Sequence, residues 1–201
     1  VDHGDLGVEI LNKDLHKYID TDKYDELIKI AVKNHNKYKI EDGLTQEQEL
    51  FAKIIRDADK IDIFYEGVTM FWNGKEELVE GSLISPEVFK QIENKTQVKR
   101  EVRQTPIDDV LSVLGFIFDI NFFKSFEILK QEDYVNKMLN RYKMKDLESE
   151  KELEEIKSIA NKMISPKMMK KHTIKLKFGQ TVDFAALGKS FVEKGYERVD
   201  M

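Results

Sequence analysis

Apolar residues recur every three or four positions along most of the first 164 residues, with polar residues between them. This period matches the turn of an α-helix and predicts helices with one buried face. The predicted helices lie at 5–19, 25–33 and 46–64, from Ser85-Pro86 onward, and at 105–119, 122–142 and 148–163. Thr45 and Gln48 form a capping-box pattern before the third of them. The sequence therefore predicts a mainly α fold.

The last part of the chain has a different pattern. Residues 172–178 alternate apolar and basic residues, which is typical of a strand with one buried face. Residues 184–194 then suit a short helix that ends at Gly195 as its C-cap. We expect a helical domain over 1–164 and a small strand-helix appendage over 165–201.

A step in charge supports this boundary. The whole chain has 33 Lys and Arg against 38 Asp and Glu, a net charge of −5. Residues 165–201 hold eight of the bases and four of the acids, a charge of +4, which leaves 25 bases and 34 acids, or −9, for the rest. Such a change of sign within one chain is typical of a domain boundary.

Composition limits the possible chemistry. The 201 residues are 41% hydrophobic and 35% charged, as in ordinary globular proteins. The chain has no cysteine, which excludes disulfides, thiolate metal sites and a cysteine nucleophile, and fits a reducing cytoplasm. No apolar run has the length needed to span a bilayer, so we expect a cytoplasmic location and no membrane partner.

Three places put metal-competent side chains at or inside predicted helices. They are His3 before the first helix, His35 at the end of the second, and Asp59, which lies between Asp57 and Asp62 in the third. Imidazole nitrogens together with carboxylate oxygens suit Mn, Fe, Zn or Mg. The alternative is structural: a histidine near a helix end can simply cap it, and Asp57 could pair with a neighbouring basic side chain.

Two further groups are candidates for substrate binding. Lys99, Arg100 and Arg103 form a basic cluster within an acidic region, and could anchor a substrate phosphate or form a solvated helix face. Phe71 and Trp72 could line a substrate pocket or form a local core.

The order of these segments resembles the HD-domain superfamily of metal-dependent phosphohydrolases. The three matching blocks are DHGDLGVEIL at 2–11, AVKNHNK at 31–37 and IIRDADKIDIF at 54–64, and the helices from 105 to 164 also resemble the later part of bacterial members. By this resemblance Asp59 would be the metal ligand that closes the site. His3 and His35 would complete a second metal site or bind substrate phosphate, and Asp57 and Asp62 would support the ligands or cap helices.

The resemblance implies a divalent metal cofactor and hydrolysis of a nucleotide-like or other phosphate ester by metal-activated water. The family is named for a His-Asp pair on an early helix, and no His-Asp dipeptide occurs in this chain. That pair would lie before Asp2, so we expect the chain to present only part of the site. This departure leaves a non-catalytic binding or regulatory module as the alternative.

The end of the chain carries a second resemblance. Residues 172–201, ending in GYERVDM, resemble a segment in an N-terminal module of the bacterial transcription-repair coupling factor. The stretch contains no helicase motif and implies no ATPase activity. It suits either a fused segment or an appendage that packs on the helical domain. Its charge is modest and lacks interleaved aromatic residues, so we expect a small phosphate compound, and no nucleic acid, as partner.

Overall fold

The computed structural model describes residues 2–165, which form helices and contain no β-strand. The α-helices are α1 (His3–Asp14), α2 (Asp25–Asn34), α3 (Gln46–Thr69), α4 (Glu76–Glu80), α5 (Pro86–Glu93), α6 (Pro106–Gly115), α7 (Phe123–Gln131), α8 (Tyr134–Leu139) and α9 (Leu147–Met163). Three short 3-10 helices join them at Leu15–Lys17, Arg100–Val102 and Phe116–Asp119. The mainly α prediction is confirmed for this part of the chain, and the strand and helix predicted within 172–194 lie outside it.

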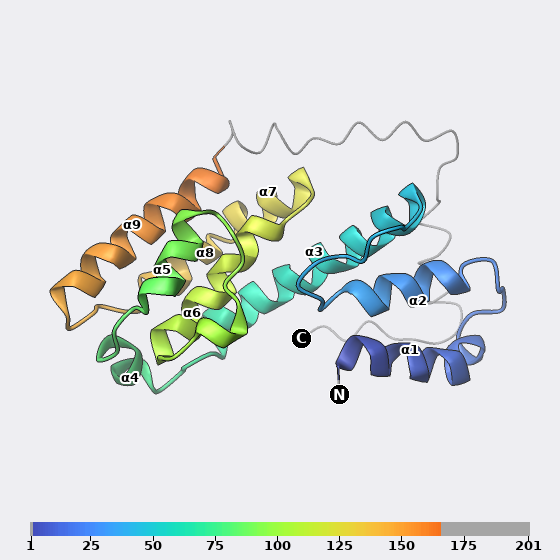
Figure 1. Ribbon diagram of the computed structural model, residues 1–201, viewed down its shortest axis with the longest axis horizontal. Coiled ribbons are helices and arrows are strands. Elements are labelled where there is room, and N and C mark those ends of the chain that lie inside the picture. Colours follow the sequence, from blue (N-terminus) through green and yellow to red (C-terminus); the bar gives the residue numbers. More distant parts are fainter. Residues whose placement is uncertain (1, 166–201) are drawn as a thin grey trace.

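The long helix α3 connects two groups of helices. Figure 1 shows α2 along one part of α3 and α1 beside α2, while α4 to α9 gather around the other end of α3. The helix starts where the sequence predicts, because Thr45 and Gln48 form the reciprocal capping box. It continues past the predicted end at Phe64 to Thr69, so its 24 residues extend about 36 Å.

The main hydrophobic core lies between the second half of α3 and helices α4 to α9. Its completely buried large side chains include Phe64, Leu111, Leu114, Ile117 and Phe126. Burial of side chains of this size contributes about 1.5–3 kcal/mol each to the free energy of unfolding. This core holds helices α4 to α9 against the second half of α3.

A buried carboxylate, that of Asp108, joins the starts of α5 and α6. It accepts hydrogen bonds from the backbone N–H of Ser85 at 3.0 Å and from the Ser85 hydroxyl at 2.6 Å. It also accepts from the backbone N–H groups of Gln104 and Thr105. Because these donors belong to two helix starts, one side chain sets how α5 and α6 meet.

The predicted helix over 122–142 is two helices. Asp133 has a φ of 52°, in the left-handed region, and this turns the chain between α7 and α8. The Asn136 side chain donates a hydrogen bond to the Asp133 carboxylate at 2.6 Å and stabilises the turn. Aspartate tolerates this conformation better than most residues, but the apolar period runs through the break and does not reveal it.

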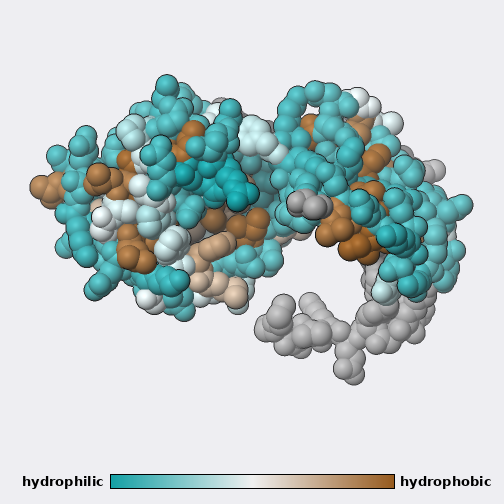
Figure 2. Space-filling view, turned by 60° about the horizontal axis from the view of Figure 1, so that its bottom comes forward, coloured by the Kyte–Doolittle hydropathy of each residue, from teal (hydrophilic) through white to brown (hydrophobic). Residues whose placement is uncertain are grey.

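Helices α1 and α2 bury few of their apolar residues. In α1 only Gly4 is buried, and Leu6 and Ile10 are 43% and 53% exposed. Figure 2 shows apolar surface on the group of helices that includes α1 and α2. Within residues 2–165, no helix combines the length and hydrophobicity needed to cross a membrane.

Candidate functional site

The structure brings His3 and His35 together. His3 is the first residue of α1, and His35 follows the last residue of α2. Their ring centroids are 4.8 Å apart and the rings meet edge to face, with an angle of 64° between their planes. Two of the three residues predicted to bind metal are therefore neighbours, although 31 residues separate them in the sequence.

The N-terminus of α1 is tied to the segment after α2 by Asp2. Its carboxylate accepts the backbone N–H groups of Gly4 and Asp5 and so caps the helix. It also accepts a hydrogen bond from the Asn36 side chain at 3.0 Å and forms an ion pair with Lys37 at 3.1 Å. These contacts, that of Asn36 first and that of Lys37 second, hold the pKa of Asp2 far below its usual range.

A glycine permits the close approach of the two segments. A Cβ atom on Gly4 would lie 2.5 Å from the side-chain oxygen of Asn36 and 2.9 Å from the backbone oxygen of Lys33. The second contact is with backbone and cannot relax by rotation of a side chain. The glycine of the DHG sequence therefore allows α1 and α2 to meet where the two histidines lie.

Hydrogen bonding indicates different tautomers for the two histidines. His35 Nδ1 lies 2.5 Å from the backbone oxygen of Val32, so it carries the proton and leaves Nε2 with a free lone pair. The Asn36 amide nitrogen faces both the Asp2 carboxylate and His3 Nδ1, at 3.0 and 3.3 Å. An amide NH2 group has two hydrogens and only donates, so it serves both acceptors and His3 Nδ1 accepts, which leaves the proton on His3 Nε2. His35 Nε2 is thus an acceptor and His3 Nε2 a donor.

The buried side chain of Arg56 fixes the segment that carries His35. Its guanidinium donates to the backbone oxygens of Asn34 at 2.7 Å and Lys37 at 2.6 Å. Carbonyl groups at the end of a helix have no N–H donor from a following turn, and Arg56 supplies the missing donors. The same group forms an ion pair with Asp119 at 2.5 Å. Arg56 therefore joins the end of α2 and the middle of α3 to the 3-10 helix Phe116–Asp119 of the second group of helices.

The carboxylates of the third sequence block have separate positions. Asp57 is buried and accepts hydrogen bonds from the backbone N–H groups of Asn121 and Phe122, which immediately precede α7, so it holds the segment that leads into this helix. Asp59 is half-buried one turn beyond Arg56 on α3 and accepts no hydrogen bond in the described part of the chain, while Asp62 is exposed.

Residues 2–165 contain no group of three or more His, Asp or Glu side chains arranged so that it could hold a metal ion. The pair of histidines and Asp59 thus do not form such a group. The donor set fits a divalent cation only in part, since His35 Nε2 is available but a stable site needs several ligands.

The three basic residues predicted to bind phosphate do not converge. Arg103 donates to the Ser112 hydroxyl at 3.1 Å and pairs with Asp109 at 3.5 Å. The Lys99 ammonium lies 5.9 Å from the centre of the Tyr38 ring. Arg100 is exposed in the 3-10 helix between them.

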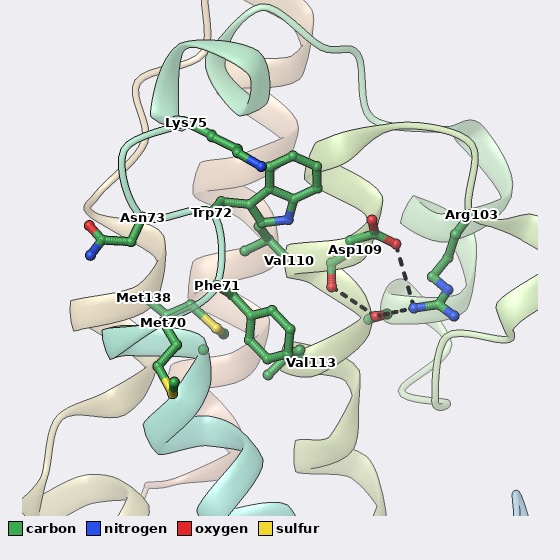
Figure 3. A pocket seen from close by; sticks show the side chains of 12 residues that line it. Met70, Phe71, Trp72, Asn73, Lys75, Arg103, Asp109, Val110, Val113 and Met138 are labelled. Carbon is green, nitrogen blue, oxygen red and sulfur yellow. Dashed lines mark hydrogen bonds and ion pairs between the residues drawn. The ribbon is translucent and has the colours of Figure 1, made fainter.

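A cavity of about 490 Å³ lies where Arg103 faces the loop after α3, and Figure 3 shows its lining. Phe71 and Trp72 both line it, and Trp72 also packs against the core, as the alternative of a local core predicts; that the cavity binds substrate stays a prediction. Sequence reasoning missed Lys75 and Met138, which also line the cavity. No local pattern marks them, because they come from different elements.

Comparisons of the chain with protein-family models, with curated proteins and with solved structures find no match. The fold and the two histidines are thus the structural basis for a functional assignment.

Proposed function

We propose that the protein is a divalent-metal-dependent phosphohydrolase of the HD class that acts on a nucleotide-like or other phosphate ester. The observation that carries the proposal is the contact between His3 and His35, with ring centroids 4.8 Å apart. The resemblance of the blocks around them, in the family's order, suggested these two residues and Asp59. A nucleotide-like substrate suits a cytoplasmic location.

The two tautomers suit two roles in phosphate chemistry. The lone pair on His35 Nε2 suits a metal ion, with Asp59 as a further ligand from α3. The Nε2–H of His3 suits a phosphate oxygen of the substrate. Mn, Fe, Zn or Mg supplies an activated water in such sites. Residues 2–165 do not form a complete set of metal ligands, so the roles proposed for His3, His35 and Asp59 are binding roles only.

Metal content and metal titration test the proposal. The full chain should bind Mn²⁺ or Zn²⁺ in calorimetric titration, and His35→Ala and Asp59→Asn should each lower the affinity by about 10–100-fold, as loss of a metal ligand or its support does. His16→Ala is the matched control, since His16 pairs with Asp25 through Nε2 and lies outside the site. Unchanged affinity in both site variants would overturn the metal assignment.

Turnover is the second measurement. Release of phosphate from nucleoside monophosphates should require added metal and should fall in His3→Ala. A non-catalytic binding module is the alternative, favoured by the incomplete ligand group among residues 2–165. It predicts that phosphate esters bind in a manner that depends on His3 while no phosphate is released with any of the four metals.

A further inference from the structure

The cavity beside Trp72 is separate from the pair of histidines. Its floor includes Gly67, which lies eleven residues beyond Arg56 on α3. That spacing corresponds to about 16 Å along the helix axis. Arg56 is the residue that binds the end of α2, next to His35. The cavity therefore faces the second group of helices and shares no lining residue with the pair of histidines.

The loop that forms one wall is held in place. Arg141, which follows α8, donates hydrogen bonds to the backbone oxygens of Val68 at 3.0 Å and Phe71 at 3.2 Å. Its guanidinium also pairs with Glu76 at 3.0 Å, at the far end of the loop. A loop anchored at both ends forms its wall before any ligand binds, so less ordering entropy is lost on binding.

Trp72 itself has a left-handed backbone, with a φ of 55°. A bulky residue in this conformation is strained by roughly 1–3 kcal/mol. The Lys75 backbone N–H donates to the Trp72 backbone oxygen at 2.9 Å and closes the turn. The turn keeps the indole in the wall of the cavity, where Figure 3 shows it near Phe71 and Lys75.

The chemistry of the lining is aromatic on one side and cationic at the edges. Phe71 is 42% exposed and Met138 offers a polarisable sulfur. Lys75 is exposed and forms no ion pair within residues 2–165. Arg103 is only loosely paired with Asp109, at 3.5 Å, and its Nε–H has no acceptor in this part of the chain. Lys75 and Arg103 thus carry two positive charges beside the single negative charge of Asp109, which favours binding of an anion next to the aromatic rings.

We propose that this cavity is a second binding site, for a planar heteroaromatic ring that carries one phosphate, as in a nucleoside monophosphate. The ring stacks on Trp72 or Phe71, and the phosphate binds Arg103 and Lys75. The cavity volume of about 490 Å³ lies in the usual range for small-ligand sites. The site does not rest on the phosphohydrolase assignment, because it uses neither histidine.

The test uses the fluorescence of Trp72, which is the only tryptophan in the 201-residue chain. Titration of the full chain with AMP should quench this emission saturably, with a Kd below about 1 mM. Adenosine and inorganic phosphate, each lacking one half of the ligand, should bind at least about tenfold more weakly. Calorimetry under the same conditions gives the stoichiometry independently of any change in emission.

Variants then assign the contacts. Arg103→Met and Lys75→Met should each weaken AMP binding by about tenfold, and Lys75 is exposed, so its replacement leaves the fold intact. Arg100→Met is the matched control, because Arg100 lies three residues from Arg103 and does not line the cavity. The titrations contain no added divalent metal, so that a metal-dependent phosphate site at the histidines contributes nothing to the AMP signal.

Three results would overturn the proposal. They are the lack of saturable AMP binding in both measurements, equal affinity for adenosine and AMP, and full affinity in both cavity variants.

Discussion

The carboxylate of Asp57 accepts hydrogen bonds from both the backbone N–H and the side-chain amide of Asn121, at 3.0 and 2.9 Å. It thereby joins the middle of α3 to the start of α7. Asp57 belongs to the sequence block that resembles the metal-ligand block of HD proteins, and its oxygens are already occupied by N–H donors. The residue ties α3 to the segment that leads into α7, and of the two aspartates only Asp59 accepts no hydrogen bond within residues 2–165.

Replacement of Asp57 should therefore reduce stability strongly. Asp57→Ala leaves the N–H groups of Asn121 and Phe122 without their acceptor, and should lower the free energy of unfolding by about 2–4 kcal/mol. The midpoint of urea unfolding measures this change. Asp62→Ala, on the same helix but exposed, should change stability by less than about 0.5 kcal/mol. Equal midpoints for the two variants would contradict the role of Asp57 in holding the segment before α7.

The ion cluster of Asp119 with Arg56 and Lys60 should respond unequally to substitution. The Lys60 ammonium lies 2.9 Å from Asp119 and is buried, and this burial lowers its pKa although Asp119 opposes the shift. Asp119→Ala leaves two buried cations without their carboxylate and should cost about 3–5 kcal/mol.

Lys60→Met is the matching variant, since it removes one cation and keeps the pair of Arg56 with Asp119. Its stability should equal or exceed that of the wild type, because an apolar side chain avoids the desolvation of the ammonium. Thermal unfolding of both variants at neutral pH gives the comparison. A Lys60→Met protein as unstable as Asp119→Ala would show that the ammonium itself is required.

His16 should make stability depend on pH. Its hydrogen bonds, to the backbone oxygen of Ile19 first and to the Asp25 carboxylate second, raise its pKa above 6.5. The folded state therefore holds the proton more tightly than the unfolded state, so the stabilisation is complete below 6.5 and is lost as pH rises through the folded pKa. The Tm difference between wild type and His16→Ala should thus shrink from about pH 5.5 to about pH 8.5. A constant difference would exclude this linkage.

Two helical glycines should differ in their tolerance of alanine. A Cβ on Gly115 would lie 3.0 Å from the backbone nitrogen of Val98, which cannot rotate away, so Gly115→Ala should destabilise by about 1–3 kcal/mol. On Gly67 the near contacts are the side chains of Met138 and Val113, and helix propensity favours alanine by about 1 kcal/mol. Gly67→Ala should remain within about 1 kcal/mol of the wild type. Denaturant unfolding of both variants measures the two changes in stability. A Gly67→Ala protein less stable than Gly115→Ala would show that Val98 can move.

The sequence by itself determined most of the helices, because their starts depend on residues close together in the chain. The capping box of Thr45 and Gln48, the Ser85-Pro86 pair and the Thr105 cap each mark a helix start that the structure has. Helix period and capping are local interactions, so they can be read before the fold is known. The sequence also placed His3 and His35 near helix ends, where the structure has them.

The partners of these residues depend on how the helices pack. Arg56 and Asp57 are consecutive residues of opposite charge, so the sequence alone allows them to pair. On a helix, however, the side chains of consecutive residues point about 100° apart. One therefore reaches the end of α2 and Asp119, while the other reaches Asn121. The contact of His3 with His35 and the cavity beside Trp72 likewise join distant segments, and such contacts depend on how helices pack rather than on any local pattern.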